Sequence, residues 1–213
     1  MIGPMRITVF GASGATGREL VAQALAAGHQ VTAFVRTPAK LTVSAPALAR
    51  VQGDVTDATA VARAIAGSEA VFVALGAASP LKLDTAITDG MRHILAAMHD
   101  HGVRRLIYLS FIGVRESRVE AGWFVKHIAV RLLANEVAGH EAREAMIKAS
   151  ATDFTIVRAP KLFTGARQGP LRHGEHMAAT SPFAMLSRAD LAAFLLGQLS
   201  DTTYIRHPVT VMP

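Results

Sequence analysis

The chain has 213 residues, of which 51% are hydrophobic and 18% charged. These values predict one globular domain over residues 1–213 and exclude a disordered chain. The net charge of +6 is spread along the sequence, and aromatic residues make up 6%. A phosphate-bearing small molecule therefore explains the charge at least as well as nucleic acid, which we do not expect as a partner.

The absence of cysteine excludes disulfides, thiolate metal ligands and a cysteine nucleophile. No apolar stretch reaches the roughly 18 residues typical of a membrane span, and no signal segment is evident. We therefore expect a cytoplasmic protein without a membrane anchor.

The first elements predicted along the chain form a strand, a helix and a second strand. Residues 5–10 are a short apolar run, residues 15–27 have helical periodicity, and residues 30–35 are rich in β-forming types. The unit has the length of a parallel crossover connection.

The alternation then continues to the end of the chain. Further strands are predicted at 49–53, 70–75, 104–109, 154–158 and 203–212, and further helices at 57–66, 83–102, within 120–150 and after the Ser-x-x-Asp capping sequence at 187–190. Residues 163–181 lack a clear period and are interpreted as a loop over the site. This order predicts an α/β fold with a doubly wound, mostly parallel Rossmann sheet and helices on both faces.

A glycine-rich turn separates the first strand from the first helix. Its glycines recur at intervals of three, which suits a tight turn, close approach of a pyrophosphate, and packing of the helix on the sheet. The helix N-terminus adds free amides and a partial positive charge. The residues expected to bind a dinucleotide here are Gly11, Ser13, Gly14, Ala15, Thr16 and Gly17.

Arg36 ends the second strand, where a carboxylate would bond the ribose hydroxyls of NAD. A guanidinium instead suits a 2′-phosphate, and Lys40 adds a second positive charge. NADP(H) is therefore the expected cofactor. The alternative is a solvated surface arginine.

The ends of the third and fourth strands offer further contacts to the cofactor. Asp54, or the amide beside it, lies where the adenine amino group would be, although it could instead cap the following helix. Leu75 and Gly76 follow the fourth strand, where the backbone passes the cofactor ribose.

Several segments together resemble the atypical short-chain dehydrogenase/reductase group, in particular biliverdin-IXβ reductase/flavin reductase and NmrA-like NAD(P)H-binding proteins. They are GASGATG, VRTPAKL, GDVTD, VALGA, DGMRHILAAMHDHGVRRLIYLS, TIVRAP and LSRADLAAFLL, which span nearly the whole chain. The resemblance implies NADPH in the glycine turn, its 2′-phosphate at Arg36 and its adenine at Asp54 and Val55. It also implies a nicotinamide near Ser110, Phe111, Ala159 and Pro160.

Ordinary short-chain dehydrogenases use a Tyr with a Lys four residues later. Tyr108 and Tyr204 are the only tyrosines here, and neither has that lysine. Ser110, where the family's active-site serine lies, could orient a carbonyl or the nicotinamide amide, or could simply close its strand.

Lys126 and His127 occur at about the chain distance of the missing pair, in a stretch that also contains Trp123. Either could donate a proton, with Lys126 retained as the catalytic candidate, or both could lie on the solvated side of a helix. The histidine spacings match no zinc motif, so no metal is expected.

These features predict an NADPH-dependent reductase of a small conjugated acceptor such as a flavin, quinone or tetrapyrrole. Transfer to such an acceptor needs mainly alignment, with the proton coming from solvent. The alternative is a non-catalytic, NADP(H)-binding redox regulator of the NmrA-like kind.

Overall fold

The computed structural model of the chain describes residues 3–76, 85–118, 128, 130–177, 181 and 184–213. The strands are β1 Arg6–Phe10, β2 Gln30–Val35, β3 Leu48–Gln52, β4 Ala70–Val73, β5 Arg105–Phe111, β6 Asp153–Ala159, β7 Lys161–Phe163, β8 Arg172–Gly174, β9 Met185–Ser187 and β10 His207–Met212. The α-helices are α1 Ala15–Ala26, α2 Ala58–Ile65, α3 Thr85–Asp100, α4 Val130–Leu132, α5 Ala134–Ala149 and α6 Arg188–Gly197, with short 3-10 turns at Pro38–Lys40 and Arg115–Arg118.

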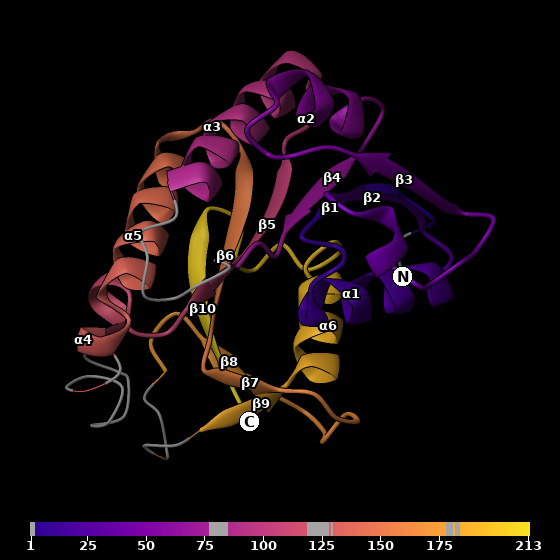
Figure 1. Cartoon of the computed structure of the whole chain (residues 1–213). Helices are drawn as coiled ribbons and strands as arrows, with labels where there is room; N and C mark the ends of the chain where they lie inside the picture. Colours follow the sequence, from indigo (N-terminus) through magenta and orange to yellow (C-terminus); the bar gives the residue numbers. More distant parts are fainter. Residues whose placement is uncertain (1–2, 77–84, 119–127, 129, 178–180, 182–183) are drawn as a thin grey trace.

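Eight strands form one twisted sheet in the order β3-β2-β1-β4-β5-β6-β10-β8 (Figure 1). Every pair except β10 with β8 is parallel, and β5 and β6 pair along their whole length, from Arg105 with Asp153 to Phe111 with Ala159. The first six positions follow the Rossmann order, so the predicted fold class is confirmed.

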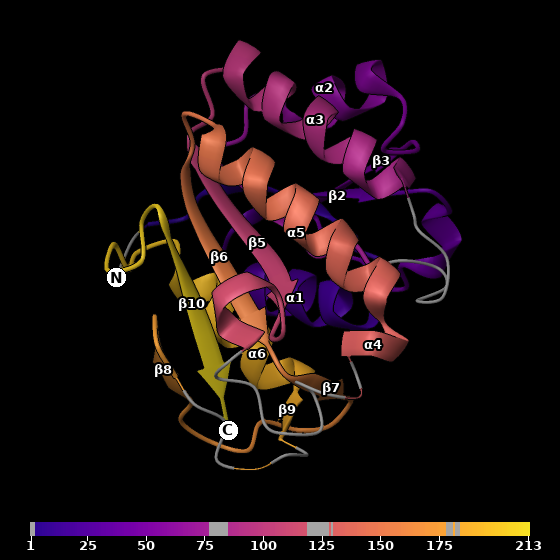
Figure 2. The same cartoon turned by 90° about the vertical axis from the view of Figure 1, so that its left-hand side faces the viewer.

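Helices cover both faces of this sheet, with α1 and α6 on one face and α2, α3 and α5 on the other (Figures 1 and 2). Side chains such as Leu20 and Leu191 fill the core under α1 and α6, and Ile65 and Ile94 help to fill the core under α2 and α3. Both faces of β1 are buried because successive residues alternate between these cores, with Val9 in the first and Phe10 in the second.

The loop predicted at 163–181 is partly wrong. Phe163 ends β7, which pairs with β9, and Arg172–Gly174 forms β8 along the sheet edge. Three residues are too short to produce a periodic pattern, and their hydrogen bonds come from β10, about 40 residues away.

Helix caps settle a second expectation. Asp57 caps α2 by accepting hydrogen bonds from the amides of Thr59 and Ala60. The alternative that Asp54 caps this helix is therefore wrong, because Asp54 accepts from the amide and hydroxyl of Thr56 instead. Ser187 caps α6 as predicted, by accepting from the amide of Asp190.

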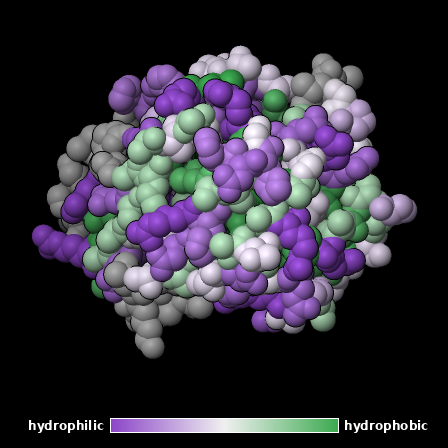
Figure 3. Space-filling view, turned by 90° about the horizontal axis from the view of Figure 1, so that it is seen from above, coloured by the Kyte–Doolittle hydropathy of each residue, from purple (hydrophilic) through white to green (hydrophobic). Residues whose placement is uncertain are grey.

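The face seen from above carries hydrophilic residues interspersed with smaller hydrophobic areas (Figure 3). Within the described part of the chain, no helix is both long and apolar enough to cross a membrane.

Candidate functional site

The carboxyl ends of the parallel strands open onto one groove made of two adjoining cavities. The outer cavity, about 590 Å³, lies beyond the ends of β1 to β4, and the inner one, about 540 Å³, lies beyond β4, β5 and β6. The two share the residues Gly14, Ala74, Leu75 and Gly76. In open α/β sheets, ligands bind at this edge.

The glycine turn forms the wall between β1 and α1. Gly11 has a φ of +84°, and a Cβ there would lie 2.4 Å from the Ala74 carbonyl oxygen. A Cβ on Gly17 would lie 2.1 Å from the carbonyl oxygen of Gly11, so this glycine lets α1 pack closely on the turn. Both positions exclude any side chain.

Gly14 differs from these two glycines because it faces open space. A Cβ on Gly14 would meet only the Gly11 carbonyl oxygen within 4 Å, at 3.1 Å, and Gly14 lines both cavities. It is also the N-cap of α1, where no side chain makes a capping hydrogen bond. The turn thus offers the room and the positive helix end that a pyrophosphate requires.

Arg36 and Lys40 lie exposed at the far end of the outer cavity, beyond the end of β2. Asp54 and Val55 line the same cavity after β3. Hydrogen bonds from the amide and hydroxyl of Thr56 lower the pKa of Asp54, with a smaller contribution from the charge of Arg36. This carboxylate is therefore ionised at neutral pH, beside a guanidinium.

The inner cavity brings together the residues expected near the nicotinamide. Ser110 and Phe111 end β5, and Ala159 and Pro160 end β6. Ser110 is 4% exposed, and its hydroxyl donates to Glu144 Oε1 at 2.7 Å. The serine proton is thus used in this bond, which leaves the serine oxygen as an acceptor, and His140 Nδ1 lies 3.4 Å from that oxygen.

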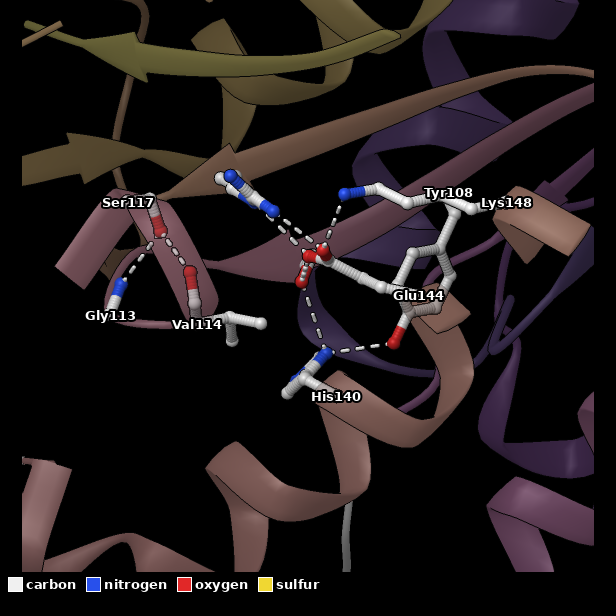
Figure 4. Close-up of polar contacts among 9 residues, drawn as sticks. Tyr108, Gly113, Val114, Ser117, His140, Glu144 and Lys148 are labelled. Carbon is white, nitrogen blue, oxygen red and sulfur yellow. Dashed lines mark hydrogen bonds and ion pairs between the residues drawn. The ribbon is translucent and has the colours of Figure 1, made fainter. Parts of the chain in front are cut away.

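A buried network that the sequence did not predict surrounds Glu144 on α5 (Figure 4). Glu144 is fully buried and accepts from Arg158 through Nε at 3.1 Å and Nη2 at 2.6 Å. Lys148 Nζ lies 4.0 Å from Glu144 Oε2. The two-point contact between the arginine and the carboxylate compensates two charges that burial would otherwise make costly.

His140 connects this network to the cavity (Figure 4). Tyr108 Oη lies 2.7 Å from His140 Nδ1, and Arg143 Nε donates to the same Tyr108 oxygen at 2.8 Å. Burial lowers the pKa of His140, although its bond to Glu136 opposes the shift. Burial also raises the pKa of Tyr108 to about 12, against the nearby charge of Arg143. Both side chains are therefore neutral at pH 7.

The predicted residues and the structure can now be compared. The residues expected around the cofactor, from the glycine turn to Pro160, line one or both cavities, with Gly17 supporting the turn from behind. Lys126 and the Trp123 segment lie outside the described residues. Among the described residues, Leu133, Glu136 and His140 also line the inner cavity.

Glu136, His140 and Glu144 were missed, although a signal existed in their spacing of four residues along one predicted helix. That spacing places the three side chains on one helix face.

The fold and the glycine-lined groove define a dinucleotide-binding protein of the Rossmann class. The chain belongs to the NAD(P)H-binding family, whose model matches residues 11–202. It is 31% identical over 204 residues to (4-alkanoyl-5-oxo-2,5-dihydrofuran-3-yl)methyl phosphate reductase from Streptomyces griseus. That match covers 92% of this chain, which spans 64% of the relative's length.

Solved structures agree on the fold. ChuY, an anaerobillin reductase from Escherichia coli O157:H7, superposes with a TM-score of 0.82 at 21% identity, covering 97% of this chain and 96% of that one. A short-chain dehydrogenase/reductase from Veillonella parvula in complex with NADP gives 0.81 at 20% identity, covering 98% and 94%.

Proposed function

We propose that this chain is an NADPH-dependent reductase of a small conjugated acceptor. The observation that carries the proposal is the continuity of the groove. The outer cavity has the elements for a dinucleotide, and the inner cavity leaves room for a ring-sized acceptor beside the expected nicotinamide. The family membership supports cofactor binding.

In this proposal each end of the cofactor has its own set of residues. The turn around Gly14 holds the pyrophosphate, Arg36 and Lys40 hold the 2′-phosphate, and Asp54 with Val55 borders the adenine. A ribose passes Leu75 and Gly76. The positive side chains make NADP(H) the favoured dinucleotide, because a guanidinium and a phosphate form charge-assisted hydrogen bonds.

The inner residues orient the reacting ring. The oxygen of Ser110 accepts from the carboxamide of the nicotinamide, while Phe111, Ala159 and Pro160 exclude water from its surroundings. When bound, the reduced cofactor supplies a hydride to the acceptor. The protein contributes alignment, which conjugated acceptors chiefly require.

Two cations make an acidic acceptor the favoured kind. Lys161 on β7 and Arg188 at the start of α6 both line the inner cavity. The Streptomyces relative is named for a phosphate ester. We therefore propose that the acceptor carries a carboxylate or phosphate group.

The experiment mixes purified protein with NADPH and a panel of flavins, quinones and biliverdin, and follows the absorbance of the reduced nicotinamide. We expect consumption of NADPH with at least one acceptor, and faster turnover for its acidic members. Tight cofactor binding without any turnover would contradict the reductase. It would favour a redox-sensing regulator of the NmrA-like kind, which the missing Tyr-Lys pair also allows.

A further inference from the structure

One turn of α5 presents an acid and an imidazole to the inner cavity. Glu136 and His140 both line it, and Glu136 Oε1 lies 3.5 Å from His140 Nε2. Neither residue is needed to hold the cofactor in the site described above. Glu136 lies in the first turn of the helix and lines the same cavity as the ends of β5 and β6.

Oxygen atoms lie near both ring nitrogens of His140, with Tyr108 Oη 2.7 Å and Ser110 Oγ 3.4 Å from Nδ1 and Glu136 Oε1 3.5 Å from Nε2. Arg143 Nε can only donate, so it occupies a lone pair of the Tyr108 oxygen. We assign the Tyr108 hydroxyl proton to His140 Nδ1, at 2.7 Å, because this tautomer leaves an N–H at Nε2 for the Glu136 carboxyl group. A neutral imidazole that accepts at Nδ1 carries its proton at Nε2, which faces Glu136.

Charged groups surround this pair on every side. Arg143 and Glu144 approach it along α5, and Arg158 on β6 neutralises Glu144. Across the cavity, Lys161 on β7 and Arg188 on α6 are cationic. The carboxylate that remains when Glu136 gives up a proton is therefore stabilised by an N–H donor and by positive charge in the same cavity, and this favours proton transfer from Glu136.

We infer that Glu136 is the proton donor of the reductase proposed above, on which this inference rests, and that His140 is its positioning residue. When the acceptor has gained two electrons and one hydrogen from the reduced cofactor, it carries an excess negative charge on an oxygen or nitrogen. The O–H bond of the protonated Glu136 carboxyl breaks, and its proton forms the new bond to that atom. Glu136 is left as a carboxylate that accepts from His140 Nε2, and it regains a proton from water.

This assignment gives the acid that the missing tyrosine would otherwise supply. A purely structural role for the Glu136–His140 pair, as a helix-stabilising contact between residues one turn apart, would predict no change in the pH dependence of turnover. The pH profile therefore separates the two roles.

The principal test is Glu136→Gln, which keeps the shape of the side chain and removes the acidic proton. We expect kcat to fall on the order of 10²-fold, the usual contribution of a general acid, with NADPH affinity unchanged. The decline of the wild-type rate toward high pH should vanish in this variant. Glu141→Gln, the same change at a neighbouring position that does not line either cavity, should leave both readouts as in the wild type.

A second variant tests positioning. His140→Leu removes the N–H that favours the Glu136 carboxylate, so the high-pH limb of the rate profile should move to higher pH.

A third readout does not depend on turnover. With NADP⁺ bound, nitrogen NMR of His140 should show the proton at Nε2, and Glu136→Gln should lower the pKa of His140 because it removes a partner that raises it.

The outcomes are distinct. If the wild type turns over and Glu136→Gln keeps its kcat and pH profile, the assignment of Glu136 is overturned while the reductase stands. A His140 proton at Nδ1 would overturn the positioning role. A wild type that binds NADPH but reduces no acceptor would overturn the proposed function, and donation by Glu136 with it.

Discussion

Arg36 and Lys40 are the residues that distinguish the two nicotinamide dinucleotides in the proposed site. They lie exposed beyond β2, at the end of the outer cavity. Arg36 offers a planar donor set that matches a phosphate, whereas Lys40 acts as a point charge. The preference for NADPH over NADH should therefore depend more on Arg36 than on Lys40.

Arg36→Ala should weaken NADPH binding by about 1.5 to 3 kcal/mol, the range for hydrogen bonds to charged groups, and leave NADH binding nearly unchanged. Calorimetric titration of both cofactors measures the difference. Arg92→Ala is the matched control, because Arg92 lies on α3 and pairs with Asp89. An unchanged preference for NADPH would refute the role of Arg36.

At the scale of elements, α5 shows where interpretation of the sequence fails. Its buried face carries His140, Arg143 and Glu144, and charged residues are normally assigned to solvent when only the sequence is known. The buried charges of Arg143 and Glu144 are compensated by hydrogen bonds with Tyr108 and Arg158, which lie on strands distant in sequence. The strands β1 to β6 were predictable because each carries its own apolar pattern, whereas a polar network across three elements has no local pattern.

Residues 167 and 168 of the predicted loop show the same limitation, because one side chain of α6 anchors them. Asp190 is 1% exposed and accepts from the Ser187 hydroxyl and the Gln168 amide, each at 2.7 Å, and from Arg167 Nε at 3.3 Å. The capping sequence identified Ser187, but the anchoring of residues 167 and 168 depends on tertiary contacts.

Asp190→Ala should therefore lower the free energy of unfolding by roughly 1 to 3 kcal/mol, because it leaves the buried Ser187 hydroxyl and the Gln168 amide without their acceptor. Urea denaturation measures this change. Asp100→Ala, at the exposed end of α3, serves as the control and should have an effect near zero. Equal stabilities of the two variants would contradict the anchoring role.

At the scale of the whole molecule, stability and the proposed site share His140. The pKa of His140 in the folded protein is below 6.5, whereas the unfolded imidazole binds a proton near its ordinary value. As the pH falls through the ordinary pKa of histidine, the unfolded state binds a proton at residue 140 and the folded state does not. The contribution of neutral His140 to stability is therefore complete above that pKa and is lost as the pH falls below it. The lowered carboxyl pKa values of Asp54, Asp153, Asp190 and Asp201 change the stability mainly below about pH 5.

Lowering the pH from about 7.5 to about 5.5, across the ordinary titration of histidine, should reduce the stability of the wild type more than that of His140→Gln. Urea unfolding at several pH values measures both slopes. His101→Gln changes an exposed histidine and should follow the wild type. Parallel slopes for wild type and His140→Gln would show that burial does not shift this residue.

The parallel order of β1 to β6 brings the glycine turn, Arg36 and the end of β5 to one edge of the sheet. The sequence was sufficient to predict this edge, because the alternation of strands and helices determines it. It could not show that two cavities join there, since that depends on how the side chains pack.

The most direct test of the central claim, that the turn around Gly14 binds NADP(H), is the affinity of Gly14→Ala for NADPH. A Cβ at Gly14 would lie 3.1 Å from the Gly11 carbonyl oxygen, in the groove that Gly14 lines, so the variant should fold with a small loss of stability and lose most of its affinity. Gly197→Ala, at a position with no atom within 4 Å of the added Cβ, should bind as the wild type does. If titration shows that Gly14→Ala binds NADPH as tightly as the wild type, or that the wild type binds none, the account is contradicted.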